Sequence, residues 1–409
     1  MMRSLTAAQA EVLGALSRLP AALVAIGDVL GLVPATPVVA PSPVPPFTNS
    51  AMDGYAVRAE DVESTPVDLT VIEDVPAGRV ATRSLGPGTA IKIMTGAPIP
   101  EGADAVVRVE DTSQSGDIVT IMIGVPTGTS VRRAGGDVEA GTEVIGSGIR
   151  LAAAHIGVLA NLGIAQLAVH RRPRVALAST GDELVPVDGP ALGPGQIRDS
   201  NRPMLAAMLT ELGVQVIDLG RIPDDAAALR EAIASGVEAA DVIVTSGGVS
   251  MGEYDLVKKV LGELGSIEFW QVAMQPAKPF AFGTVGGKPL FGLPGNPVSS
   301  FVAFEQFVRP GLLKMMGARS LFRPRVQGRT KVKLSTDPEK TVFVRVRTST
   351  EGEVRWCAPS GGQSSNVLSA VVAGDAFAVV PEGTADVDVG EPVMLEMFRW
   401  PEERSFDER

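Results

Sequence analysis

The chain has 409 residues, more than one hydrophobic core usually organises, so we expect several domains. Apolar residues make up 45% and charged residues 20%, and the 45 glycines and 31 prolines indicate many turns and strands rather than a disordered chain. A net charge of −11 and an aromatic content of 4% argue against a nucleic-acid partner, because phosphate binding needs an excess of Lys and Arg.

The N-terminal region combines a helix with a proline-rich connector. Helical spacing runs from Leu5 to Leu19, and Pro20 ends it. Repeated proline over residues 35–47 predicts an extended connector. No signal peptide or membrane helix fits these patterns, so we expect a soluble cytoplasmic protein.

Short alternating stretches separated by turn residues predict a small all-β unit between residues 49 and 138. Its expected strands are DLTVIEDV, TAIKIMTG, DAVVRVED and DIVTIMI. Residues 152–162 again have helical spacing.

At Arg172 strands of the buried type begin to alternate with helices. The strands are RVALAST, VQVIDLG, ADVIVTS and KPLFG, and the helices are NRPMLAAMLTELG, DDAAALREAIASG, YDLVKKVLGELG and NPVSSFVAFEQFV. This alternation predicts a doubly wound, mostly parallel sheet of the α/β class. After Gly317 alternating strands return and predict a C-terminal β domain.

The turns that follow these strands carry the candidate site, because ligands of open α/β sheets bind beyond the carboxyl ends of the strands. Small residues let main-chain N–H groups approach an anion, so the SGG and PGN turns are candidate phosphate cradles. The alternative is that Gly and Pro are ordinary turn residues and that each Asp caps a helix. The candidate residues are Glu183, Asp224, Ser246, Gly247, Gly248, Ser250, Asp255, Pro294, Gly295, Asn296, Pro297 and Ser299.

A metal at this edge should be a hard cation. The single cysteine, Cys357, and the two histidines, His155 and His170, cannot build a thiolate or His-rich centre. Carboxylates suit Mg²⁺ that bridges substrate phosphates, and the candidate ligands are Glu183, Asp224 and Asp255.

Several longer motifs resemble those of the molybdopterin molybdenumtransferases, the MoeA family, which includes the gephyrin E domain. They run in family order from about residue 5 to residue 398. The motifs are PPFTNSAMDGYAV (45–57), KIMTGAPIPEGADAVVRVED (92–111), AGGDV (134–138), STGDEL (179–184), IRDSNRPML (197–205), TSGGVSMGEYD (245–255) and FGLPGNPVSS (291–300).

The resemblance implies an enzyme that inserts molybdate into adenylylated molybdopterin and releases AMP, with Mg²⁺ as the expected cofactor. It also implies an elongated homodimer whose site is shared between subunits. Composition and charge had already argued against nucleic-acid and membrane partners. An upstream adenylyltransferase and downstream molybdoenzymes are possible partners. The expected domains are a split linker and dimerisation domain (1–45 and 139–170), an inserted β domain (46–138), a molybdopterin-binding α/β domain (171–317) and a C-terminal barrel-like β domain (318–409).

Individual residues are carried over from the family motifs. The expected catalytic residues are Asp53, Thr95, Asp137, Glu183, Asp224 and Asp255. Pro294 and Pro297 are placed in the site, and Arg345 and Ser365 near the molybdate. A dianion needs cations or hydroxyl donors, for which Lys278, Ser299, Arg345 and Ser365 are candidates. The alternative for Arg345 is a solvated strand residue.

One departure concerns the segment Gln275-Pro276-Ala277-Lys278-Pro279, where the family often has a lysine at the first position and glycine at the third. Glutamine carries no charge, so this chain would bind molybdate more weakly if that lysine holds the anion. The departure keeps open a non-catalytic pterin-binding or scaffold paralogue of the gephyrin type. A further alternative is the related adenylyltransferase, which resembles residues 171–317 alone.

Overall fold

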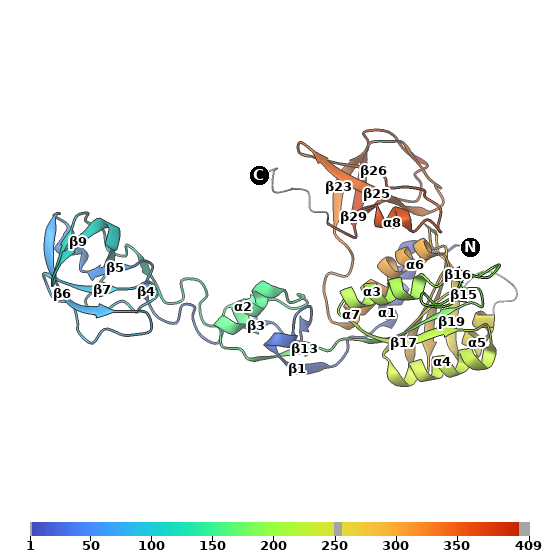
Figure 1. Ribbon diagram of the computed structural model, residues 1–409, viewed down its shortest axis with the longest axis horizontal. Helices are drawn as coiled ribbons and strands as arrows, with labels where there is room; N and C mark the ends of the chain where they lie inside the picture. The colour runs from blue at the N-terminus through green and yellow to red at the C-terminus, as the bar shows by residue number, and fades with distance from the viewer. Residues whose placement is uncertain (1, 249–255, 401–409) are drawn as a thin grey trace.

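The structure, a computed structural model, describes residues 2–248 and 256–400. The molecule is elongated: an all-β domain lies at one end, a small domain follows, and an α/β domain with a β-barrel beside it forms the other end (Figure 1). None of the helices in the described ranges has the length and apolar character needed to cross a membrane.

The α/β domain is built on a six-stranded sheet with the order β17-β14-β18-β22-β21-β19. β17, β14, β18 and β22 run parallel, whereas β21 is antiparallel to both of its neighbours. This confirms the predicted mostly parallel sheet. The strands are β14 (Arg174–Thr180), β17 (Gln215–Ile222), β18 (Val242–Ser246), β19 (Gly265–Gln271), β21 (Pro279–Val285) and β22 (Lys288–Leu293).

Helices cover both faces of this sheet. One face carries a core that includes Leu205, Phe291 and Phe307, and the other a core around Ile233 and Leu261. The helices are α3 (Asn201–Glu211), α4 (Ala226–Ala239), α5 (Leu256–Leu264), α6 (Pro297–Ala303) and α7 (Arg309–Met315), with a π-helical turn at Phe304–Val308 between the last two.

The first helix, α1 (Leu5–Ala15), packs on the α/β domain rather than in the split domain to which residues 1–45 were assigned. Leu5, Ala8 and Val12 lie on one face of the helix and are buried in the same core as Phe307. The sequence pattern shows that this helix has an apolar face, but it does not show which domain covers it.

The chain passes through the middle domain twice, before and after the inserted β domain (Figure 1). The middle domain contains β1 (Ala21–Ala25), β2 (Val33–Pro34), β3 (Val38–Val39), β12 (Glu143–Ile145), α2 (Ala153–Asn161) and β13 (Gln166–His170). The inserted domain contains β4 (Asn49–Ser50), β5 (Gly54–Val57), β6 (Val67–Val75), β7 (Thr89–Ile93), β8 (Ala105–Arg108), β9 (Thr112–Ser115), β10 (Ile118–Ile121) and β11 (Val131–Arg132).

The C-terminal sheet closes on itself because β25 pairs with both β26 and β27, which confirms the predicted barrel-like domain. Its elements are β23 (Arg325–Thr330), β24 (Leu334–Ser335), β25 (Thr341–Glu351), β26 (Val354–Pro359), α8 (Ser369–Val372), β27 (Ala376–Val380), β28 (Asp386–Val387) and β29 (Pro392–Met397).

A short strand, β20 (Met274–Gln275), connects the barrel to the α/β domain. It pairs in parallel with the start of β25, where Met274 faces Thr341 and Gln275 faces Val342. The Thr341 N–H also donates to the Ala273 carbonyl at 3.0 Å. Main-chain hydrogen bonds therefore fix the barrel against the loop that follows β20.

Candidate functional site

The turns singled out in the sequence lie along one edge of the α/β sheet. Because β14, β17, β18 and β22 are parallel, the turns after them emerge on the same side. Gly247 and Gly248 have φ values of 96° and 67°, and a Cβ on Gly247 would lie 2.5 Å from the Thr180 carbonyl oxygen. Glycine is thus needed where the SGG turn approaches the neighbouring strand end.

The carboxylates at this edge belong to exposed turns that bind each other. The Asp182 N–H donates to Asp224 Oδ2 at 3.4 Å, and the Asp224 N–H donates to Asp182 Oδ1 at 3.2 Å. The Glu183 carboxylate folds over Gly181, where a Cβ would come within 2.5 Å of Glu183 Oε2.

Magnesium is compatible with this donor set, although the described ranges contain no group of three metal-ligating side chains. Mg²⁺ commonly takes one or two protein carboxylates and completes its shell with phosphate oxygens and water. Glu183 and Asp224 are such hard donors. Asp255, the third expected ligand, and Ser250 lie outside the described residues.

A buried amide joins the two glycine-containing turns. Asn201, at the start of α3, donates from Nδ2 to Ser246 Oγ at 2.8 Å and to the Gly295 carbonyl at 2.7 Å. Its Oδ1, like Thr180 Oγ1 and Thr245 Oγ1, is buried without a partner in the described part of the chain. Unsatisfied buried polar atoms at strand ends are expected where a polar ligand completes the site.

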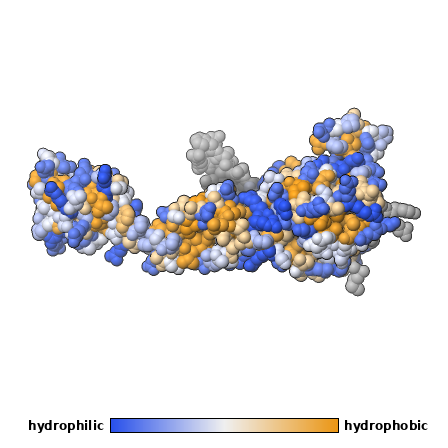
Figure 2. All heavy atoms as spheres, turned by 90° about the horizontal axis from the view of Figure 1, so that it is seen from below, coloured by the Kyte–Doolittle hydropathy of each residue, from blue (hydrophilic) through white to orange (hydrophobic). Residues whose placement is uncertain are grey.

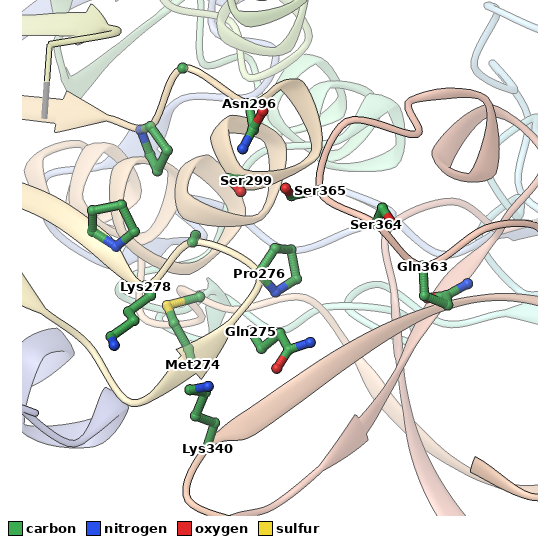
Figure 3. A pocket seen from close by; sticks show the side chains of 14 residues that line it. Met274, Gln275, Pro276, Lys278, Asn296, Ser299, Lys340, Gln363, Ser364 and Ser365 are labelled. Atoms are coloured by element: carbon green, nitrogen blue, oxygen red, sulfur yellow. The ribbon is translucent and has the colours of Figure 1, made fainter. Parts of the chain in front are cut away.

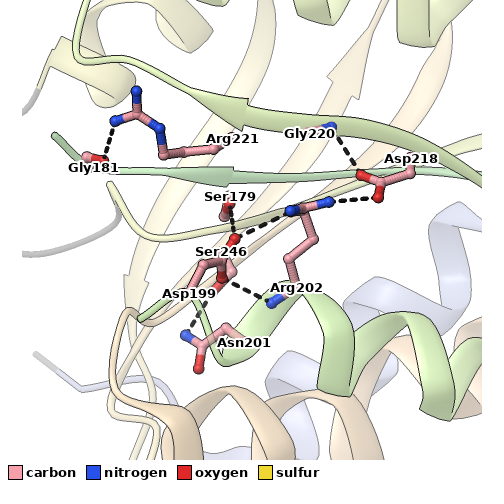
Figure 4. A network of polar contacts seen from close by, with 9 residues as sticks. All are labelled: Ser179, Gly181, Asp199, Asn201, Arg202, Asp218, Gly220, Arg221 and Ser246. Carbon is pink, nitrogen blue, oxygen red and sulfur yellow. Dashed lines mark hydrogen bonds and ion pairs between the residues drawn. The ribbon is translucent and has the colours of Figure 1, made fainter. Parts of the chain in front are cut away.

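Asp199, two residues before Asn201, anchors the start of α3 to β14 of the sheet (Figure 4). Its carboxylate is 1% exposed, accepts from Ser179 Oγ at 2.6 Å, and binds Arg202 Nε at 3.1 Å. Arg202 also pairs with Asp218 of β17. The IRDSN motif contains Asp199 and Asn201, but the sequence did not identify either as a site residue, because no pattern shows that α3 begins beside both turns.

A pocket of about 640 Å³ lies between the α/β domain and the barrel (Figure 3). It brings together many of the expected substrate-binding residues. The α/β domain contributes Lys278, Pro294, Gly295, Asn296 and Ser299, and the barrel contributes Gln363, Ser364 and Ser365. Pro297 opens α6 directly after Asn296, and the Val298 N–H donates to the Ser365 carbonyl at 3.0 Å.

The segment that departs from the family pattern forms one wall of this pocket. Gln275 and Lys278 are exposed, and Ala277 has a φ of 75°. Such a left-handed conformation is favourable for glycine and costly for alanine. Gln275 brings no charge to the wall.

Arg345 is not the solvated strand residue considered as an alternative, because it is 2% exposed. Its guanidinium donates to the Gly362 and Ser364 carbonyls at 3.3 and 3.2 Å, and burial lowers its pKa. It lines a neighbouring cavity of about 190 Å³ rather than the larger pocket. Arg345 therefore supports the turn that carries Ser364 and Ser365 into the pocket.

Three expected catalytic residues lie on the inserted domain. Asp53 Oδ1 accepts from the Thr95 N–H and from its hydroxyl, each at 2.7 Å, and these bonds lower the pKa of Asp53. Asp137 is exposed, and its N–H donates to the Val44 carbonyl at 3.0 Å. This domain lies at the far end of the molecule from the α/β domain, so one chain does not bring these residues to the sheet edge (Figure 1).

Comparisons with known proteins cover nearly the whole chain. Residues 3–163 match the MoeA N-terminal region (domain I and II), residues 176–314 match the probable molybdopterin binding domain, and residues 327–398 match the MoeA C-terminal region (domain IV).

Individual relatives are similar over comparable lengths. The chain is 40% identical to molybdopterin molybdenumtransferase 2 of Mycobacterium tuberculosis, covering 89% of this chain and 92% of that protein. It is 38% identical to the molybdopterin molybdenumtransferase of Haemophilus influenzae, covering 88% and 90%. A crystal structure of the molybdopterin biosynthesis MoeA protein of Pyrococcus horikoshii superposes with a TM-score of 0.80 at 35% identity, covering 98% of this chain and 100% of that one.

Proposed function

The chain belongs to the molybdopterin molybdenumtransferase (MoeA) family, and from this premise we propose that it inserts molybdate into adenylylated molybdopterin and releases AMP. The family places it among the enzymes of molybdenum cofactor biosynthesis. The observation that carries the finer proposal is the adjacency of an anion cradle and a hydroxyl-lined pocket: Asn201 ties the SGG turn to Gly295, which also lines the pocket.

In this proposal the sheet edge binds the phosphates of the substrate. The Gly248 N–H would face the anion, the Gly247 N–H donates to the Leu293 carbonyl at 3.1 Å and fixes the turn, and the Asn201 amide keeps the two turns at a fixed spacing. Glu183 and Asp224, with Asp255, would hold Mg²⁺, which when bound neutralises charge on the phosphates as the phosphoanhydride bond breaks. Water attacks the adenylyl phosphorus as this bond breaks, so AMP leaves with the added oxygen and the pterin keeps its own phosphate.

The pocket beside this edge receives molybdate as the second substrate. Lys278 supplies a positive charge, and the hydroxyls of Ser299 and Ser365 can donate hydrogen bonds to its oxygens. The pocket and the cradle share the turn Pro294-Gly295-Asn296, so molybdate would be held next to the pterin.

We further propose that a homodimer completes each site. Asp53, Thr95 and Asp137 lie on a domain remote from the sheet edge of their own chain, so a second copy would have to supply them (Figure 1). The middle domain exposes apolar side chains, including Leu23, Leu30 and Val158, and hydrophobic residues cover much of its face in Figure 2. Such a surface supports association between copies.

Purified protein supplied with molybdopterin-adenylate, molybdate and Mg²⁺ tests the proposal. We expect AMP release that depends on both molybdate and Mg²⁺, together with a pterin product that activates a molybdenum-free apoenzyme. Binding of the adenylate without turnover would instead support the scaffold alternative. Adenylation of free molybdopterin from ATP would support the adenylyltransferase.

A further inference from the structure

The pocket between the α/β domain and the barrel has a positive charge on each of its two walls. Of the residues that line it, only Lys278 and Lys340 are cationic. Lys278 follows β20 on the α/β side, and Lys340 precedes β25 on the barrel side (Figure 3). Gln275 also lines the pocket and is neutral.

The position of Lys340 is set by main-chain pairing between the two domains. Thr341, the next residue, is in register with Met274, and its N–H donates to the Ala273 carbonyl at 3.0 Å. A slip of one residue would turn the alternating side chains to the opposite face. The pairing that attaches the barrel therefore also presents Lys340 to the pocket.

An acidic neighbour holds the Lys340 ammonium group. Lys340 Nζ pairs with Asp337 Oδ2, and the Glu339 N–H donates to Asp337 Oδ1 at 3.0 Å. The hydrogen bond from Lys340, followed by that from Glu339, lowers the pKa of Asp337, and the charge of Lys278 adds to the effect. The charges of both lysines therefore act on the Asp337 carboxylate.

The ion pair is weak enough to be replaced. The side chains of Lys340 and Asp337 are 19% and 33% exposed, and solvent screens a pair of this kind, so the pair contributes little to stability. A dianion between two ammonium groups gains charge-assisted hydrogen bonds from both walls. Exchange of Asp337 for an incoming oxyanion is therefore favourable.

We propose that Lys340 is a molybdate-binding residue that supplies, from the barrel, the second positive charge facing Lys278 across the pocket. This inference rests on the proposed function, since it takes molybdate as the oxyanion. Asp337 holds the ammonium group while the pocket contains no oxyanion. Lys340 also offsets the missing charge at Gln275, so this chain need not bind molybdate weakly.

Direct titration of the purified full-length protein with molybdate, by calorimetry and without pterin, tests the role of Lys340. Lys340→Gln should raise the molybdate Kd roughly tenfold or more, the loss expected for one charged hydrogen bond. Lys340→Arg should keep most of the affinity. Lys331→Gln is the matched control, because Lys331 is a barrel lysine paired with Glu351 outside the pocket lining, and it should leave the Kd unchanged.

A second experiment moves the positive charge to another position in the pocket and measures recovery of molybdate binding rather than its loss. Adding Gln275→Lys to Lys340→Gln places a second cation in the pocket, on the wall that carries Lys278, and should recover most of the lost affinity. Asp337→Asn frees Lys340 and should leave the molybdate Kd equal or lower. A Lys340→Gln protein that is folded and binds molybdate like the wild type overturns the proposal, as does wild-type protein that binds no molybdate.

The outcome separates this inference from the proposed function. If molybdate binding depends on Lys340 but no AMP is released, Lys340 remains a molybdate-binding residue and the transferase reaction is rejected. Molybdate-dependent AMP release whose KM for molybdate is the same in Lys340→Gln and wild type would retain the reaction and reject Lys340.

Discussion

The side-chain amide of Asn201 and the main-chain carbonyl of Gly295 are joined by a hydrogen bond of 2.7 Å. The same Nδ2 reaches Ser246 Oγ at 2.8 Å, so one buried group spans the ends of β18 and β22. The two turns proposed to hold the substrate phosphates are thereby fixed relative to each other and not only to their own strands.

Asn201→Asp should loosen this connection without changing side-chain volume. A carboxylate cannot donate to either acceptor, and its charge faces the Gly295 carbonyl. We expect the KM for the pterin-adenylate to rise about tenfold, with a loss of about 1–3 kcal/mol in the free energy of unfolding. Steady-state AMP release measures the KM, and urea denaturation measures the free energy of unfolding. An unchanged KM alongside the loss in stability would reduce Asn201 to a purely structural residue.

The shared site predicts complementation between two inactive variants. Asp53→Ala removes a residue of the inserted domain, and Glu183→Ala removes one of the sheet edge, so neither homodimer should release AMP. In a randomly mixed population about half the dimers are mixed, and each has one intact site, giving roughly a quarter of wild-type activity. Unfolding and refolding the two proteins together, then assaying AMP release, checks this. No recovery in verified mixed dimers would argue for sites within single chains.

The ion pair between Asp241 and Arg171 should make stability depend on pH at the acidic end. Burial opposes ionisation of Asp241, but hydrogen bonds from Arg171 at 2.6 and 2.7 Å and from the Arg174 N–H at 2.9 Å lower the pKa of Asp241 from 3.8 to about 2. A folded-state pKa below the unfolded value stabilises the protein above about pH 4, and this contribution is lost as the pH falls towards 2.

Asp241→Asn should therefore cost about 1–2 kcal/mol at pH 7, after allowance for solvent screening of Arg171, which is 36% exposed. The difference in the free energy of unfolding between this variant and the wild type should become smaller below about pH 4. Urea denaturation across pH 3–7 measures this difference, with Glu263→Gln, which removes an exposed ion pair, as a control expected to leave the free energy of unfolding nearly unchanged. A difference in the free energy of unfolding that stays constant from pH 3 to pH 7 would contradict a lowered pKa for Asp241.

Cys357, the single cysteine, should be unreactive in the folded protein. It lies in the barrel core at 1% exposure, and burial raises its pKa to about 11. Thiolate is the reactive form, so we expect no reaction with a disulfide reagent at pH 8 until the barrel unfolds. Labelling at increasing urea should follow the unfolding curve. Rapid labelling in buffer without urea would show that the barrel opens locally.

The sequence predicted the parts of this fold that depend on local pattern. Continuous apolar runs such as RVALAST and ADVIVTS identified β14 and β18, and the order of strands and helices predicted parallel pairing. Parallel pairing in turn placed the turns that contain Gly247 and Gly295 on one edge. The β19 segment was not predicted, because its residues are only half-buried at the sheet edge and give a weak signal.

Features that depend on contacts between distant segments were not predictable. The apolar face of α1 identifies a helix but not the α/β core that covers it. Arg345 alternates with apolar residues along β25, as a solvated side chain would, yet the turn at 362–364 closes over it and accepts its hydrogen bonds. Asn201 acquires its role only because α3 starts between two turns that are far from it in the chain.

The pairing of β20 with β25 links the attachment of the barrel to the shape of the pocket wall. Tilting the barrel away would break the hydrogen bond between Thr341 and Ala273 and pull on the segment that contains Gln275 and Lys278. The same movement would then widen the entrance of the pocket and weaken the binding of the anion by Lys278 and Lys340. A ligand that wedges between the two domains would lower molybdate affinity without touching either lysine.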